Sequence, residues 1–230
     1  MTKMPIVLRS GLMAFAAAAV VAAPAVASEP PTLFALRMNA ALQAQSSVRT
    51  VATGYGAPVP IRLVTDAGPD SGTQRITYGT GHVTVLVVPG AAYVRGDEQV
   101  LVRYMGYKPG PAARFSNVWI RIPVSDRDYG AVSSEVTMSS VANDLTLSPP
   151  INALPSKAIG GRRLAVIQGT LFGRPLGATT YASPASHLPV RVVTRKGSER
   201  VAVVVLSNWG EAVHVTAPAN STPIAATGLE

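Results

Sequence analysis

Residues 72–97 read GTQRITYGTGHVTVLVVPGAAYVRGD, and this stretch predicts three antiparallel strands in a row, joined by tight turns. A two-residue turn at Pro89-Gly90 sets the register of the second hairpin, with Val88 opposite Ala91 and Val85 opposite Val94. Because side chains alternate along a strand, one face of this hairpin is then entirely apolar. Its residues are Val83, Val85, Val87, Ala92 and Val94.

A second hairpin is predicted near the C-terminus, where residues 190–206 read VRVVTRKGSERVAVVVL. A turn at Gly197-Ser198 would place Val192 opposite Val203 on one face, with Val190, Val201 and Val205. Arginines mark the other face as solvated, and Val204 and Leu206 are apolar exceptions on it. Strands this apolar need a deep core, a cover or a bound apolar ligand.

Helical patterns precede and interrupt the strands. The best helix runs from Thr32 to about Gln45, with an apolar stripe that includes Leu33, Leu36 and Ala40. Residues 104–115 are rich in glycine and proline and predict a loop, whereas 126–132 and 139–145 predict two short helices. Further strands are expected at 47–53, 61–65, 117–123, 156–159, 162–170, 178–182, 189–195, 201–207 and 213–217. A helical insertion within a β pattern could cover an open apolar face.

The N-terminus has the features of a secretory signal. Lys3 and Arg9 form a basic region, an apolar run follows from Gly11 to about Ala23, and Ala25-Val26-Ala27 suits a cleavage site. An uncleaved membrane anchor is the alternative, although the apolar run is shorter than the roughly 20 residues that a spanning helix needs. We therefore expect a signal peptide at 1–27, a single domain at 28–218 and a frayed tail at 219–230 that is rich in alanine, threonine and proline.

Charge and cysteine content narrow the functional classes. The chain has 20 Lys and Arg against 12 Asp and Glu, a formal net charge of +8. These charges are scattered, and export argues against nucleic acid as a partner, so a solvated basic surface is favoured over a binding patch. With 0 cysteines, the chain has no disulfide, no thiolate metal site and no cysteine to carry the acyl anchor of a bacterial lipoprotein.

A search for catalytic motifs returns none. The sequence lacks the motifs of serine hydrolases, phosphate-binding loops, zinc proteases and dinucleotide-binding folds. His82, His187 and His214 lie far apart in sequence, and the acidic pairs at 97–98 and 126–128 are typical of a hairpin exit and a capped helix. We predict no catalytic residue, no metal ligand and no cofactor, and core or rim packing for Trp119 and Trp209.

Four runs of sequence resemble, in their order, the LolA-like proteins, and most closely the actinobacterial lipid-carrier lipoproteins of the LppX and LprG type. They are Thr84–Asp97, Ser116–Pro123, His187–Val193 and Leu206–Pro218. They contain, in turn, the patterns Tyr-Val-x-Gly, Trp-x-x-x-Pro, a Pro-containing strand start, Ser-x-Trp and Ala-Pro. Two departures stand out, because Leu188-Pro189 supplies one proline where the pattern has two, and the acylated cysteine is missing.

The resemblance implies an α+β, mainly β fold. It consists of a strongly bent antiparallel sheet, a half-open barrel, with helices that cover the concave face and acyl chains that enter between them. The missing cysteine suggests a diffusible carrier or a relative that uses the fold differently.

The leading hypothesis is an exported, non-enzymatic carrier of acyl lipids or glycolipids, monomeric and with an envelope protein as a further partner. The residues expected to line its apolar cleft are Leu36, Val83, Val85, Val87, Val94, Val192, Val201, Val203 and Val205. The alternative is an envelope sensor or protein-interaction module with a closed core, and a secreted hydrolase is the weakest reading.

Overall fold

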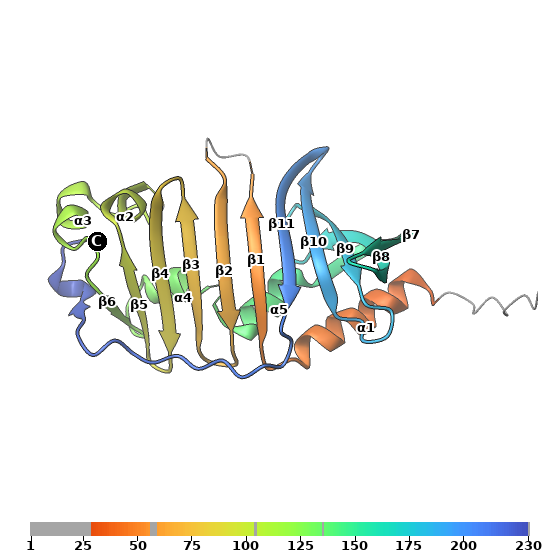
Figure 1. Cartoon of the computed structure of the whole chain (residues 1–230), viewed down its shortest axis with the longest axis horizontal. Helices are drawn as coiled ribbons and strands as arrows, with labels where there is room; N and C mark the ends of the chain where they lie inside the picture. Colours follow the sequence, from red (N-terminus) through yellow and green to blue (C-terminus); the bar gives the residue numbers. More distant parts are fainter. Residues whose placement is uncertain (1–28, 56–58, 104, 135, 230) are drawn as a thin grey trace, which may run out of the picture.

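The structure is a computed structural model that describes residues 29–229, apart from 56–58, 104 and 135. The expected signal peptide at 1–27 lies outside these residues. A single open sheet of 12 strands runs along the length of the molecule in the order β12-β6-β5-β4-β3-β2-β1-β11-β10-β9-β8-β7 (Figure 1). Every pairing is antiparallel except that of β12 with β6.

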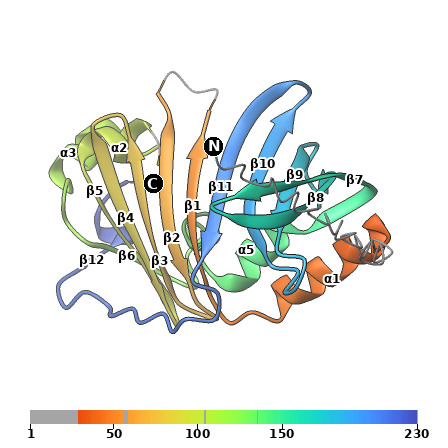
Figure 2. The ribbon, with the colours of Figure 1, turned by 45° about the vertical axis from the view of Figure 1, so that its right-hand side comes forward.

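The strand bounds show two meanders that meet where β1 pairs with β11. The first meander comprises β1 (Val48–Gly54), β2 (Ile61–Ala67), β3 (Gly72–Tyr78), β4 (Gly81–Val88), β5 (Ala91–Gly96) and β6 (Ile120–Pro123). The second comprises β7 (Leu147–Ile159), β8 (Arg162–Leu171), β9 (Gly177–Ala182), β10 (Pro189–Lys196) and β11 (Glu199–Ser207), and the short β12 (Thr222–Pro223) comes last. The mainly β, open and curved sheet expected from the sequence is therefore present (Figure 2).

The helices are short, apart from the first. They are α1 (Pro31–Gln43), α2 (Glu98–Arg103), α3 (Pro109–Arg114), α4 (Tyr129–Ser133) and α5 (Met138–Leu145), with a 3-10 turn η1 (Ile224–Ala226). The predictions of α1, α4 and α5 are confirmed to within a few residues. The prediction of a loop at 104–115 was wrong for residues 109–114, which form α3. Pro109 stands at the start of this helix, where its missing N–H costs no hydrogen bond.

The first hairpin has the register that its turn predicts. Val88 pairs with Ala91 and Val85 with Val94, so the apolar face falls where expected. Its valines join a core cluster with residues of α2, α3 and α4, among them Val100, Ala112 and Val132. We call the face of the sheet that carries this cluster the inner face and the opposite one the outer face.

A β-bulge changes the register of the second hairpin. The Gly197-Ser198 turn forms as predicted and pairs Lys196 with Glu199, but a shift then pairs Thr194 with Ala202. Val201 is the extra residue, and each residue beyond it moves to the other face. The predicted pairing of Val192 with Val203 was therefore wrong, since Val192 pairs with Val204.

The C-terminal segment is packed against the sheet, so the prediction of a frayed tail was wrong for residues 222–229. Thr222 and Pro223 pair with β6, and Ile224 and Leu229 belong to the core cluster of the first meander. The tail reaches β6 by crossing the lower edge of the sheet in Figure 1. The composition predicted a frayed tail, but the burial of Ile224 and Leu229 and the pairing of β12 with β6 hold this segment against the sheet.

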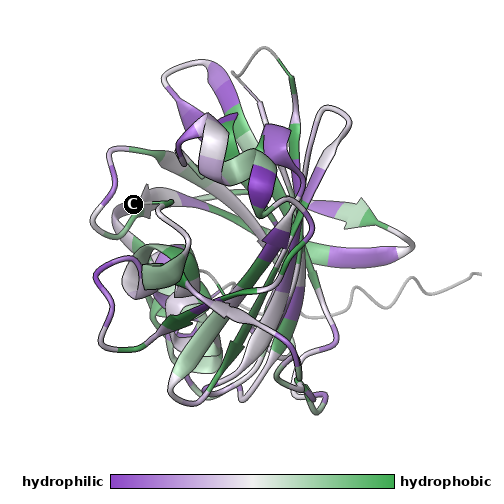
Figure 3. Ribbon diagram, turned by 90° about the vertical axis from the view of Figure 1, so that its left-hand side faces the viewer, coloured by the Kyte–Doolittle hydropathy of each residue, from purple (hydrophilic) through white to green (hydrophobic). Residues whose placement is uncertain are grey.

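A second core cluster lies on the inner face at the other end of the sheet. Phe34, Met38 and Leu42 of α1 and Val141 and Leu145 of α5 pack there against strand residues that include Val192 and Leu206. Figure 3 shows the sheet end-on, with the ribbon coloured by the hydropathy of each residue. None of the helices in the described ranges is both long and apolar enough to cross a membrane.

Candidate functional site

Small side chains follow one another along β1 on the inner face, between the two core clusters. Thr50, Ala52 and Gly54 alternate along β1 on this face, and their cross-strand neighbours include Thr65 on β2 and Ala202 on β11. Where large residues alternate along a strand they fill the space above the sheet, whereas these small ones leave it open. The space above the inner face is therefore open at the middle of the sheet.

This hollow is a cavity of about 250 Å³ between the sheet and α5, which we call the central cavity. Its floor consists of residues of β1, β2, β3, β10 and β11, and its walls are residues of α5, β8 and the β8–β9 turn. The lining residues are Thr50, Ala52, Gly54, Leu63, Thr65, Gln74, Val141, Asp144, Leu145, Leu171, Arg174, Leu176, Thr194, Val201, Ala202 and Val204. Most of the lining is aliphatic, which suits an apolar guest.

Polar side chains of the floor have hydrogen-bond partners at two places. Gln74 is buried and donates from Nε2 to Thr65 Oγ1 at 3.2 Å, and Thr194 Oγ1 lies 3.5 Å from the carbonyl oxygen of Ala202. Paired in this way, these groups add little cost to an apolar cavity.

One ion pair stands at the edge of the central cavity. Arg174, in the β8–β9 turn, donates to a carboxylate oxygen of Asp144 on α5. Burial raises the pKa of Asp144 above its usual value, and the charge and hydrogen bond of Arg174 oppose that rise. The pair thus ties α5 to the β8–β9 turn at the one charged point of the lining.

We expect Arg174→Ala to raise the pKa of Asp144 further, because it removes the opposing charge but leaves the burial. A carboxyl whose folded-state pKa is raised adds stability at acidic pH and loses it as the pH rises through that pKa. The variant should therefore lose more stability than the wild type between acidic and neutral pH. Carboxyl NMR titration and urea unfolding at several pH values would measure both effects, and an unchanged Asp144 pKa would contradict this assignment.

Four of the predicted lining residues lie in a filled core. Val83, Val85, Val87 and Val94 face inward as expected, but their side chains are at most 2% exposed and pack among residues of α2, α3 and α4. Three of them are on β4, which contributes nothing to the lining of the central cavity. The long valine run therefore marks packed core at this end of the sheet.

The other five predicted lining residues lie at four different places. Val201 lines the central cavity, and Val192 is fully buried in the adjacent core cluster. Val203 and Val205 lie on the outer face because of the bulge, so the prediction that they face inward was wrong. Leu36 was also misplaced, since it is 65% exposed and the buried face of α1 carries Phe34 and Met38 in its place.

Sequence reasoning missed most of the floor of the central cavity. The missed residues are small, such as Ala52, Gly54 and Ala202, and a search for large apolar side chains passes over them. The available signal was the alternation of Thr50 and Ala52 along the predicted strand 47–53, with Gly54 directly after it, because this alternation indicates an inner face that carries small side chains.

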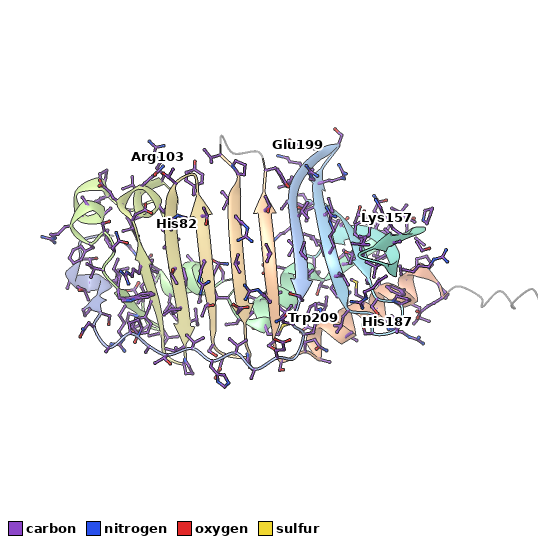
Figure 4. All side chains as sticks on the ribbon, in the orientation of Figure 1. His82, Arg103, Lys157, His187, Glu199 and Trp209 are labelled. Atoms are coloured by element: carbon purple, nitrogen blue, oxygen red, sulfur yellow. The ribbon has the colours of Figure 1, made fainter. Side chains whose placement is uncertain are left out.

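The three histidines do not converge. His82 lies at the start of β4, where Nδ1 is 3.3 Å from Thr77 Oγ1, and His187 pairs with Glu29 at the far end of the sheet (Figure 4). His214 lies in the segment after β11. No group of three or more metal-ligating side chains occurs within the described ranges.

The tryptophans lie outside the central cavity, as the lining residues show. Trp119 lies beneath the guanidinium group of Arg95, with 5.9 Å between Cζ and the ring centroid, whereas Trp209 packs against the core cluster of α1 and α5. Both positions are typical of rim and core packing.

No protein-family model and no curated protein matches the sequence. Among solved structures, MucB is similar to 84% of this chain, with 12% identity and a TM-score of 0.43. The chain spans 65% of the length of MucB, which also has a solved complex with MucA from Pseudomonas aeruginosa.

Two further structures are similar. An uncharacterized conserved protein from Thermus thermophilus has 9% identity and a TM-score of 0.43, with 84% of this chain and 97% of that chain covered. A putative outer membrane lipoprotein-sorting protein domain from Vibrio parahaemolyticus has 8% identity and a TM-score of 0.31, with 79% of this chain and 93% of that chain covered. Likeness this distant carries no argument about function, and placement with the LppX and LprG proteins stays a prediction.

Proposed function

We propose that this protein is an exported, non-enzymatic carrier of amphiphiles, such as acyl lipids or glycolipids, whose apolar chain enters the central cavity. The observation that supports this most is the cavity itself, about 250 Å³ of largely aliphatic space between two filled core clusters. An ordinary core closes such space with large side chains. Here the small residues of β1 and β11 keep it open, which favours a bound guest.

The size of the cavity limits what enters it. It exceeds the roughly 150 Å³ of an engineered apolar cavity that binds benzene and lies just below the roughly 300 Å³ at which ligand pockets usually begin. Burying about six methylenes would contribute roughly 5 kcal/mol, which is close to the lowest estimates of the cost of association, about 4 kcal/mol. A longer acyl chain therefore binds usefully only if more surface becomes available.

We propose that α5 supplies that extra surface by acting as a movable cover. It is eight residues long, and it contributes Val141, Asp144 and Leu145 to one wall of the cavity. The Asp144–Arg174 ion pair, which joins α5 to the β8–β9 turn, is partly exposed, and exposed ion pairs contribute little stability. An outward shift of α5 would break this pair and lengthen the apolar slot.

The filled core of the first meander favours the alternative function. Val85, Val87 and Val94 are buried among helix residues on the inner face, as expected of an envelope sensor or protein-interaction module. The two functions differ in what the central cavity holds. In the sensor, α5 stays closed and the apolar lining serves only to hold the fold together.

The test is a titration of the protein with alkyl maltosides of increasing chain length, below their micelle-forming concentrations. We expect saturable binding whose affinity rises by up to about fourfold per methylene and then levels off. The uncharged headgroup keeps electrostatic binding out of the measurement. Affinity that does not depend on chain length, or the absence of binding, would contradict the carrier function and favour the sensor.

A further inference from the structure

A second hollow lies on the outer face, opposite the second core cluster. In Figure 2 the β7–β8 hairpin crosses in front of β10 and β11. Residues of β7, β9, β10 and β11 line a cavity of about 200 Å³ on this face. It is lined by Lys157, Ile159, Thr179, Tyr181, Arg191, Val193, Arg195 and Arg200. We call it the cationic hollow, because four of these residues carry a positive charge and none is acidic.

Two of the cations face each other directly. Arg195 and Arg200 are cross-strand partners in the β10–β11 hairpin, an arrangement that destabilises a sheet when both residues carry the same charge. Each is held near the hollow by a further contact. Arg195 Nη1 donates to the carbonyl oxygen of Ser198 at 3.1 Å, and Arg200 stacks on the ring of Tyr55 with 4.5 Å between Cζ and the centroid.

Arg191 supplies an independent observation. Its Nε is buried, and within the part of the chain that the structure describes it has no hydrogen-bond partner. A buried charged donor without an acceptor is costly, and buried polar groups in folded proteins nearly always have a partner. The next residue across the sheet on this face is Tyr181, which also lines the hollow. The Nε–H group of Arg191 therefore has no acceptor among the residues that the structure describes.

An anion bound in the hollow would compensate both for the unpartnered donor and for the adjacent like charges. It would accept a hydrogen bond from Arg191 and relieve the repulsion between Arg195 and Arg200. Glu199 is adjacent in sequence to Arg200, but it does not line the hollow. It lies at the tip of the hairpin, opposite Lys196 in the strand register. The hydroxyl groups of Thr179 and Tyr181 offer further donors.

We propose that the cationic hollow binds a phosphate group. Guanidinium groups match the oxygens of phosphate in bidentate fashion, and four cations exceed what a single carboxylate would neutralise. The phosphate belongs either to the headgroup of an anionic phospholipid or to a free phosphate ion. The site lies on the opposite face of the sheet from the central cavity, so the proposal stands independently of the carrier function.

The experiment compares the wild-type protein with two variants in which one arginine is replaced by glutamine, so that each variant loses one positive charge. Arg191→Gln removes the buried donor, whereas Arg103→Gln removes an exposed charge from α2 at the other end of the sheet. Each protein is titrated with inorganic phosphate by calorimetry and by thermal shift. Each is also floated with vesicles of phosphatidylglycerol or, for comparison, of phosphatidylcholine.

We expect phosphate or phosphatidylglycerol to bind the wild type and Arg103→Gln equally, and Arg191→Gln about tenfold more weakly or worse. Saturable binding of inorganic phosphate, with a raised thermal midpoint, identifies free phosphate as the source. Binding to phosphatidylglycerol vesicles alone identifies the lipid headgroup. The proposal is overturned if neither binds, or if the two variants lose affinity equally, because the effect would then be that of net charge alone.

Discussion

Leu206→Asp is expected to unfold the protein or to destabilise it by at least about 3 kcal/mol. Leu206 is only 3% exposed, faces inward opposite Thr50 and belongs to the core cluster of α1 and α5. A carboxylate at this position would be buried without a partner, which is among the costliest of single substitutions. Urea unfolding followed by circular dichroism measures the loss.

The adjacent residue is the matched control. Val205 is 45% exposed on the outer face, with Arg191 opposite it on β10. We expect Val205→Asp to change the free energy of unfolding by less than about 0.5 kcal/mol. A register without the bulge would reverse this ranking, so a stable Leu206→Asp protein beside an unfolded Val205→Asp protein would show that the hairpin is shifted by one residue.

Gly72→Ala should cost about 2–3 kcal/mol, because the segment before α5 passes directly over this residue. A Cβ atom at position 72 would overlap the carbonyl oxygen of Val136 and lie 2.8 Å from that of Asp66. The same segment is fixed to the sheet at Gly68, whose carbonyl oxygen accepts the N–H of Met138 at 2.7 Å. The added methyl group would lift α5 away from the central cavity, so amphiphile binding should change along with stability.

Gly130→Ala is the control for this substitution. Gly130 lies exposed within α4, and a Cβ atom there would have no neighbour within 4 Å. Alanine should be tolerated and should add up to about 1 kcal/mol through its better helix propensity. Thermal midpoints of the two variants give the comparison. Equal stability would mean that the segment before α5 does not lie against β3.

The sequence predicted the first meander accurately because its signals are local. The Pro89-Gly90 turn fixes the register of its neighbours, and strict alternation then assigns Val85 and Val94 to one face. The prediction for the second hairpin was wrong for a physical reason that turn type and alternation cannot detect. The turn was correct, but a one-residue bulge at Val201 reversed the facing of Val203 and Val205.

The central cavity was harder to predict than the fold. We predicted that the valines of β4 line a cleft, but large apolar side chains tend to fill space, and these valines are packed in a core. The central cavity exists because Ala52 and Ala202 have small side chains. It also requires that β1 of the first meander pairs with β11 of the second. That meeting joins residues about 150 positions apart, as in the pairing of Ala52 with Val204, and no local pattern indicates it.

The central claim is that the cavity receives the apolar chain of an amphiphile. Its most direct test is the alkyl maltoside titration repeated on Ala52→Phe, which fills the cavity, and on Thr53→Phe, which places the same side chain on the outer face of β1. We expect the first variant to lose binding at an unchanged thermal midpoint and the second to bind like the wild type. Equal, chain-length-dependent binding by all three proteins would contradict the claim, because the amphiphile would then bind somewhere else.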